Sequence, residues 1–340
     1  MAEKKIGKQT VIFEKRPCVI GNAAVVGRKE GEGPLSDCFD LRLKDDKYGE
    51  PTWEKAESRM LKEAMVLAMK KAGKQTKDID LVLSGDLLNQ IMSSSFMARD
   101  LQLPFLGLYG ACSTMTESLL LGAMLTEGGF AHNIVVGASS HFCTAERQFR
   151  MPVEHGNQRP PSAQWTATAA GAMVLSEQGS RIRVECGTIG KVIDAGVKDA
   201  NQMGSAMAPA AVDTILNHFA DTGRTFADYD LVLTGDLGYI GKAIATDLLI
   251  DAGMDETLVK SRYDDCGTML YDREKQDVHG GGSGCGCSAA VFSGHILKRL
   301  QAGELSRVLL LSTGAMLSTI SPFQGESIPG IAHGVVLEVS

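Results

Sequence analysis

Cys112 is the residue whose type and position best suit chemistry. It lies in the run from Leu108 to Glu117, where a strand is expected to turn into a helix. The small pair Gly110-Ala111 permits a tight turn, and Ser113 is a residue type that caps free amides at a helix start. A thiol at such a place is an activated nucleophile, a partner of amides that bind an anion, or a packed core residue. The pattern predicts a nucleophile or a carboxylate site here, and leaves both open.

Other polar side chains are expected at the same edge of the fold as Cys112. Asp86 and Asn89 follow one predicted strand, His141 follows another, and Arg150 lies in the loop beyond His141. Open α/β sheets bind ligands outside the carboxyl ends of their strands, so these residues are candidates for one crevice. Each has a plainer alternative, because an Asp after a strand often caps a helix and a loop Arg is usually solvated.

A glycine-rich block supplies the last candidates. It runs from His279 through Gly282 and Ser283 to Gly286. Bare backbone lets a ligand approach closely, or lets two elements pack tightly, and the sequence leaves both readings open. Asp236 ends a predicted strand and is expected to face the same crevice, where it and Asp86 could accept a metal.

An internal repeat indicates how these residues are positioned. Residues 78–87 and 228–237 are identical at eight of ten positions, and each reads as a buried strand bounded by Asp and Gly. Helical and strand patterns flank both copies in the same order. The chain is therefore predicted to be an α/β protein of two pseudo-symmetric βαβ-type halves, at about 1–180 and 181–340.

The helices flanking the repeats are predicted from apolar stripes and glycine stops. Helices are expected at 53–72 and 212–220, before the two repeat strands. Residues 197–208 read as an exposed loop. Two further helices are expected to begin at Cys112 and Cys287 and to run sixteen residues to a glycine.

Composition and cysteine spacing exclude several classes of protein. The 340 residues are 44% hydrophobic and 22% charged, with a formal charge of −7. No nucleic acid is expected as a partner of so acidic a chain, and no run of about 20 apolar residues spans a bilayer. The start of the chain lacks a signal-peptide pattern, so an intracellular or membrane-peripheral protein is expected. No C-x-x-C pair is present, so most of the eight cysteines are predicted to be reduced core residues.

The Ala-Cys-Ser turn before a long buried helix, with duplicated halves and a glycine-rich second-half loop, resembles the thiolase superfamily. The resemblance implies a layered α-β-α-β-α core, and it includes the type III β-ketoacyl-carrier-protein synthases. In those enzymes the matching cysteine accepts an acyl group, with His and Asn partners from the second half. Here Asp236 stands where a His is expected, and residues 281–283 contain no Asn.

Four stretches narrow the resemblance to the stage V sporulation protein AD family of spore-forming bacilli: 140–152, 156–166, 278–288 and 328–336. That family implies a non-catalytic protein that binds dipicolinic acid, free or as its calcium chelate. It implies a peripheral place at the spore inner membrane, with other SpoVA membrane proteins, in sporulation and germination. It also implies a homodimer and no cofactor, with calcium present only within the chelate.

Residue types and resemblance together give one expected ligand site. Its residues are Cys112, Ser113, Asp86, Asn89, His141, Arg150, His279, Gly282 and Ser283. Catalysis is not expected there, and Cys112 is a vestigial nucleophile. Two alternatives stay open: an active β-ketoacyl synthase III or thiolase-like acyltransferase that uses Cys112, and a purely structural subunit that needs no pocket.

Overall fold

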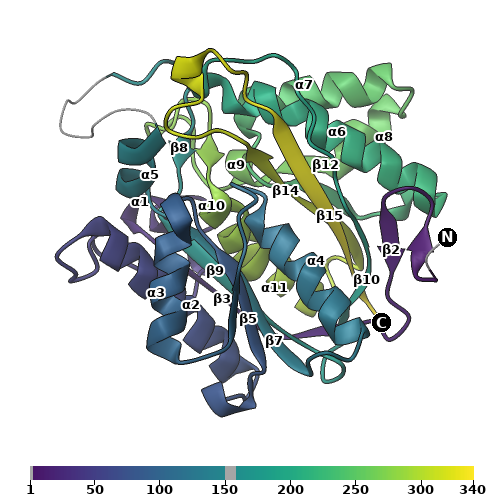
Figure 1. Cartoon of the computed structure of the whole chain (residues 1–340). Coiled ribbons are helices and arrows are strands. Elements are labelled where there is room, and N and C mark those ends of the chain that lie inside the picture. The colour runs from purple at the N-terminus through teal and green to yellow at the C-terminus, as the bar shows by residue number, and fades with distance from the viewer. Residues whose placement is uncertain (1–2, 150–157) are drawn as a thin grey trace.

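The structure is a computed structural model that describes residues 3–149 and 158–340 (Figure 1). It is a mixed α/β fold built around one large sheet, which confirms the predicted fold class. The sheet has two five-stranded parts. The first part, in spatial order, is β3 (Cys18–Val26), β9 (Ala169–Ser176), β7 (Asn133–Ser140), β5 (Leu81–Gly85) and β6 (Phe105–Gly107).

The second part of the sheet repeats the first. Its spatial order is β10 (Ile182–Thr188), β15 (Gly330–Val339), β14 (Arg307–Ala315), β11 (Leu231–Thr234) and β12 (Tyr263–Asp265). In each part the first three strands pair antiparallel and the last three pair parallel. The two repeated sequence runs, 78–87 and 228–237, contain β5 and β11, which hold the same place in their parts.

The two parts meet at β3 and β10, which share the single residue pair Cys18 and Arg183. The predicted boundary between residues 180 and 181 falls just before β10, in the connection from β9. Whether each half forms a separate folding unit stays a prediction.

Helices form three layers around the sheet. α4 (Thr114–Glu127) packs on β5 and β7 on one side and on β14 and β15 on the other. It lies in the middle layer with α10 (Cys285–Ala290), which packs on β7 and β9. α2 (Trp53–Lys71) covers the outside of the first part, together with α3 (Met92–Leu101). α6 (Met203–Thr222) and α7 (Gly238–Asp251) form the outer layer of the second part.

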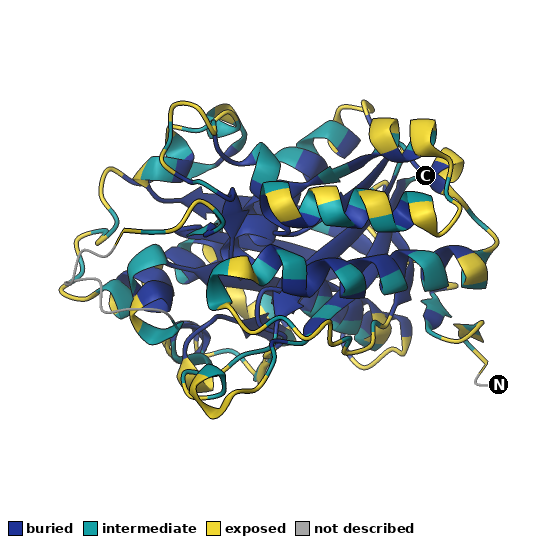
Figure 2. Ribbon diagram, turned by 90° about the horizontal axis from the view of Figure 1, so that it is seen from above, coloured by how far each residue is buried: buried dark blue, intermediate teal, exposed yellow. Residues whose placement is uncertain are grey.

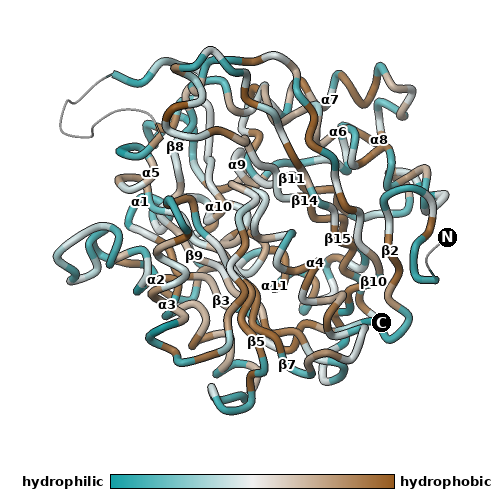
Figure 3. The backbone as a smooth tube through the Cα atoms, in the orientation of Figure 1, coloured by the Kyte–Doolittle hydropathy of each residue, from teal (hydrophilic) through white to brown (hydrophobic). Residues whose placement is uncertain are grey.

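The layers follow from the sequence patterns. Most residues of α4 are buried, as a helix between two sheets requires, whereas α2 keeps an exposed face and α6 a partly buried one. Outer helices with one exposed side are visible in Figure 2. β5 and β7 each contain a continuous hydrophobic run, at 81–83 and 134–136 (Figure 3), as expected for strands covered on both faces.

The remaining elements are short and line the edges of the core. They are β1 (Lys5–Ile6), β2 (Thr10–Ile12), α1 (Arg28–Gly31), β4 (Leu41–Arg42), α5 (Phe142–Phe149), β8 (Trp165–Thr166), α8 (Glu256–Arg262), α9 (Cys266–Met269), β13 (Gly282–Ser283) and α11 (Leu297–Gln301). β8 and β13 pair as a separate two-stranded sheet, which brings the two halves together beside Cys112.

Three helix predictions were wrong at their starts. α4 begins at Thr114, two residues after the predicted start at Cys112. α6 begins at Met203 instead of 212, so part of the predicted 197–208 loop is helical. Its first turns consist of small residues whose stripe is hard to see in the sequence, and Ala206 and Met207 are fully buried. The second central helix begins at Cys285, two residues earlier than predicted, and passes through a π-helical turn at Val291–Ile296.

Candidate functional site

A pocket opens directly at Cys112, between the two halves. Its lining consists of Leu87, Tyr109, Ala111, Cys112, Ala145, Phe149, Thr166, Ala200, Met203, Ser283, Ala315 and Leu317. None of these lining residues is Asp, Glu, Lys, Arg or His. The enclosed space is about 40 Å³, and about 450 Å³ when the open mouth is included. That space holds a few water molecules, so a larger ligand requires the wall to move.

The turn before α4 aims the thiol at this pocket. Ala111 has a left-handed backbone conformation, with φ of 51°. Such a φ strains a residue with a Cβ, and Cys112 directly follows it. The prediction that Ser113 caps the helix was wrong, because its hydroxyl donates to the Gly110 carbonyl at 2.7 Å. Ser113 is fully buried and does not line the pocket.

The carboxyl group of Asp236 lies beside the thiol of Cys112 and acts on its pKa. Burial raises the pKa of Cys112 well above its usual value, and the charge of Asp236 raises it further. A cysteine nucleophile needs the opposite shift, because the thiolate is the reactive form. The arrangement keeps this sulfur protonated.

Asp236 is held by donors from two segments. Thr313 donates its hydroxyl to Asp236 at 2.6 Å, and the Gly284 amide donates at 2.8 Å. The Ser283 hydroxyl is 3.4 Å from the same carboxyl group. Burial nevertheless raises the pKa of Asp236 to about 6, against the opposing effect of these hydrogen bonds. The carboxyl group can therefore change charge near neutral pH.

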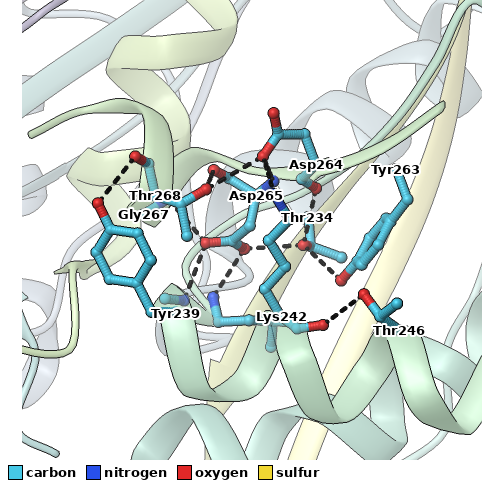
Figure 4. Close-up of polar contacts among 11 residues, drawn as sticks. Thr234, Tyr239, Lys242, Thr246, Tyr263, Asp264, Asp265, Gly267 and Thr268 are labelled. Atoms are coloured by element: carbon cyan, nitrogen blue, oxygen red, sulfur yellow. Dashed lines mark hydrogen bonds and ion pairs between the residues drawn. The ribbon is translucent and has the colours of Figure 1, made fainter. Parts of the chain in front are cut away.

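A second aspartate supports the turn that carries Asp236 (Figure 4). Asp265 accepts hydrogen bonds from the amides of Leu237 and Gly238, each at 2.9 Å, and from the Thr234 hydroxyl at 2.8 Å. These contacts satisfy free amides at the start of α7. Burial raises the pKa of Asp265 to about 7. Asp265 thus fixes the backbone on both sides of Asp236.

The glycine-rich block contributes Ser283 to the pocket, while Gly282 has a packing role. A Cβ on Gly282 would lie 3.1 Å from Cys287 Sγ and 3.2 Å from the Cα of Gly267. The Gly282 carbonyl accepts a hydrogen bond from Gln164 Nε2 at 2.7 Å. Ser283 pairs with Thr166 in the small sheet, and both line the pocket.

His141 is buried beside the site but both of its ring nitrogens are engaged. Nε2 donates to the Asp46 carbonyl at 2.8 Å, and Nδ1 accepts from the Cys143 amide at 3.2 Å. Burial lowers the pKa of His141, which favours the neutral ring. It does not line the pocket and has no contact with Cys112 among the described residues.

Two other predicted site residues do not reach the pocket. His279 is half-buried, with Nδ1 3.0 Å from the Pro160 carbonyl and Nε2 2.8 Å from Asp277 Oδ1. Asn89 is exposed, just before α3. Arg150 lies outside the described residues.

Asp86 accepts hydrogen bonds from the segment that directly follows it. Its carboxyl group accepts hydrogen bonds from the amides of Leu88 at 2.9 Å and Ser94 at 2.7 Å. The plain alternative from the sequence, a helix cap, therefore describes its contacts. Within residues 3–149 and 158–340, no group of His, Cys, Asp and Glu is arranged to hold a metal ion.

The sequence interpretation left several pocket residues out of the expected site. Asp236 holds the same position in the repeat as Asp86, and this match is the sequence signal that places it at the crevice. Tyr109, Phe149 and Leu317 lie in loops or at a helix end and carry no sequence signal for a pocket. The site that the structure does bring together is Cys112, Ser283 and Asp236.

The chain was compared with known families and proteins. The family model of stage V sporulation protein AD matches residues 7–338. Stage V sporulation protein AD of Bacillus subtilis (strain 168) is 46% identical over 335 residues, which is 98% of each chain.

Solved structures similar to this chain share its fold at low sequence identity. The 3-oxoacyl-[acyl-carrier-protein] synthase III of Aquifex aeolicus VF5 has a TM-score of 0.57 and 12% identity, over 95% of this chain and 99% of that one. Cerulenin-bound OleA of Xanthomonas campestris has a TM-score of 0.61 and 14% identity, over 96% and 100%. These likenesses confirm the thiolase-like fold.

The described part of the chain was also searched for membrane spans. None of its helices combines the length and the apolar character needed to cross a bilayer.

Proposed function

The chain belongs to the stage V sporulation protein AD family, and from that premise we propose that it is a non-catalytic receptor for dipicolinic acid. The ligand enters the Cys112 pocket, free or as its calcium chelate. With other SpoVA membrane proteins, the chain supports movement of the ligand across the spore inner membrane in sporulation and germination. The buried carboxyl group of Asp236 beside the Cys112 thiol, which keeps the sulfur protonated, is the observation that carries the non-catalytic assignment.

Nucleophilic catalysis lacks its usual helpers at this thiol. A buried carboxyl group is next to the sulfur, and each unit of raised pKa costs about 1.4 kcal/mol of thiolate formation. None of the histidines within the described residues forms a hydrogen bond with Cys112, and His141 donates to the Asp46 carbonyl instead. A base and oxyanion donors each contribute roughly 2–4 kcal/mol in cysteine and serine enzymes.

The pocket suits a flat, neutral ligand. Hydroxyl groups of Tyr109, Thr166 and Ser283 lie in a lining that is otherwise apolar. Calcium dipicolinate carries no net charge, so it loses less hydration on entry than the free dianion does. A flat ring can pack on Phe149 and Tyr109, and aromatic pairs contribute about 0.5–1.5 kcal/mol beyond area burial. We therefore expect tighter binding of the chelate, with calcium supplied by the ligand and no cofactor.

Calorimetric titration of the purified chain with dipicolinate, with and without calcium, tests the receptor role. The Ala145→Phe variant fills the pocket and is expected to weaken binding by about tenfold or more, which is about 1.4 kcal/mol or more. The Ala302→Phe variant makes the same change at an exposed position and should bind as the parent does. Absence of saturable binding to the parent chain contradicts the proposal.

An acyltransferase is the second candidate, favoured by one observation. The lining around Cys112 is mostly apolar, which also suits an acyl chain. Incubation with acyl-coenzyme A donors followed by mass spectrometry of the Cys112 peptide separates the two functions. We expect no acyl adduct, and an adduct that disappears in Cys112→Ser establishes the acyltransferase instead.

A homodimer is part of the proposal. β6 is the edge strand of the first part of the sheet, and Leu106 on it is 52% exposed. An unpaired apolar edge is a template for pairing with another strand, here β6 of a second copy. Light scattering should give a dimer for the parent chain and a monomer for Leu106→Lys. A parent chain that stays monomeric at high concentration removes this part of the proposal.

The pocket mouth also supports a peripheral place at the membrane. The loop that contributes Leu317 continues to Ile320 and Phe323, which are 59% and 89% exposed. Large apolar side chains in water favour contact with an apolar surface. Flotation with vesicles that contain the SpoVA membrane proteins should recover the parent chain. Recovery should fall in the double variant Ile320→Ser and Phe323→Ser, and equal recovery argues against this contact.

A further inference from the structure

A cluster of cations surrounds Trp165, on the strand that also lines the pocket. In β8, Thr166 faces the Cys112 pocket and Trp165 does not, as alternation along a strand requires. The indole stacks on Phe142, with ring centroids 3.7 Å apart and planes 9° from parallel. Lys29 Nζ lies 3.4 Å from the indole centroid and Arg159 Cζ lies 4.8 Å from it.

The two cations are held together by one acceptor. The carbonyl oxygen of Asp277 accepts from Lys29 Nζ at 2.9 Å and from Arg159 Nη2 at 2.8 Å. The Asp277 side chain adds an ion pair to Arg159 at 3.1 Å, but it is 70% exposed and also contacts His279. Among the described residues, Asp277 supplies the one carboxylate in an ion pair with either cation, while Glu30 and Asp46 act on Lys29 without forming an ion pair with it.

Two donors in this cluster lack acceptors. The buried atoms Arg159 Nη1 and Trp165 Nε1 have no hydrogen-bond partner among the residues that the structure describes. A buried donor without a partner costs about 1–3 kcal/mol, and more when it is charged. Burial and the charge of Arg159 lower the pKa of Lys29, against the opposing charges of Asp277, Glu30 and Asp46. A negatively charged acceptor at this place would pair with both donors and with the charge of Lys29.

We propose that Lys29, Arg159 and the indole N–H of Trp165 form a binding site for a small oxyanion, a carboxylate or phosphate group. The site lies on β8, and its residues are not those of the Cys112 pocket, so it does not depend on the proposed receptor role. Arg159 presents a planar fork that suits such groups, and the half-buried Lys29 adds a point charge. The bound anion replaces the missing acceptor for Arg159 Nη1 and Trp165 Nε1.

Fluorescence of Trp165 tests the site directly. The chain has two tryptophans, so Trp53→Phe leaves Trp165 as the only indole reporter. Titration with inorganic phosphate, and separately with malonate, at constant ionic strength should give a saturable change. Lys29→Met and Arg159→Met should weaken the response about tenfold or more, which corresponds to about 1.4 kcal/mol or more. The two titrations show whether phosphate or carboxylate is preferred.

Arg99→Met is the matched control, because Arg99 also lies over an aromatic ring, that of Phe96, but is paired with Asp100. It should leave the titration unchanged, and Lys29→Arg should keep most of the response. If a variant does not fold, the melting temperature of the parent chain with increasing phosphate decides the matter, since the site predicts a saturable rise. No saturable change in the parent, or equal responses in all variants, overturns the proposal.

Discussion

The two copies of the repeated strand end in the same residue and use it differently. β5 leads to Asp86 and β11 leads to Asp236, at equal places in the two parts of the sheet. Asp86 accepts from the amides of Leu88 and Ser94 and so stabilises its own turn. Asp236 accepts from Gly284 and Thr313 and lies beside the thiol of Cys112, whose pKa it raises.

The neighbouring edge strand explains the difference. In the second half, Asp265 of β12 pairs with Thr234 and satisfies the amides of Leu237 and Gly238. In the first half the matching position, opposite Ser84, is Gly107 of β6, which has no side chain to offer. Asp86 must therefore serve its own turn, whereas Asp265 leaves Asp236 free for the site. A duplicated strand fixes where a carboxyl group lies, and the neighbouring strand decides what it does.

Of the substitutions that test this difference between the halves, replacement of Asp265 should cost the most unfolding free energy. Asp265→Ala leaves the amides of Leu237 and Gly238 without acceptors, at about 1–3 kcal/mol for each buried group. We expect urea denaturation to show a loss of about 3 kcal/mol or more in unfolding free energy. Asp264→Ala is the control, because the Asp264 side chain is 36% exposed and its ion pair with Lys242 should contribute less than about 1 kcal/mol. Similar small losses in both variants contradict the supporting role.

The pH dependence of stability should distinguish Asp236 from an ordinary surface carboxylate. Its pKa is raised from 3.8 to about 6 in the folded chain, so the folded state holds the proton more tightly than the unfolded state. The stabilisation is fully present below about pH 4 and is lost as the pH rises through about 6. Relative to Asp236→Asn, the parent chain should lose about 3 kcal/mol between pH 4 and pH 7. Parallel curves for the two chains count against the raised pKa.

The reactivity of Cys112 should separate the two aspartates. Asp236→Asn removes a negative charge from the thiol and should lower its pKa, with about tenfold faster alkylation for each unit of pKa. Asp86→Asn is the matched change in the other repeat and should leave the rate nearly unchanged. Iodoacetamide labelling at pH 8, followed by mass spectrometry of the Cys112 peptide, measures both rates. Equal acceleration by both variants shows that Asp236 has no special effect on the sulfur.

Ser283→Ala should have the smallest effect on the fold. The Ser283 hydroxyl is 3.4 Å from the Asp236 carboxyl group, so its loss should cost less than about 1 kcal/mol of stability. The same hydroxyl lines the pocket, and calorimetry should show dipicolinate binding weakened about three- to tenfold. An unchanged affinity places the ligand away from Ser283.

The sequence predicted the fold well because its signals are local and repeated. The repeated runs at 78–87 and 228–237 contain β5 and β11. The predicted helix at 53–72 is α2, which ends at Lys71. α6 was predicted too short, since its small-residue start is stabilised by packing that no local pattern reveals.

The site was harder to predict because its contacts join distant segments. Cys112 and Ser283 line one pocket, as expected, although 171 positions separate them in the sequence. His141 follows its strand as predicted, but donates to the backbone of Asp46, a loop residue with no recognisable pattern. The Cys112–Asp236 contact depends on how the two halves pack, and so it required the structure.

A crystal structure of the chain with calcium dipicolinate tests the central claim most directly. We expect the ligand to lie between Cys112, Ser283 and Phe149, with Phe149 and Leu317 moved outward to enlarge the pocket. Ligand bound elsewhere, with this pocket closed, would contradict the proposal that the pocket beside Cys112 is the dipicolinate-binding site.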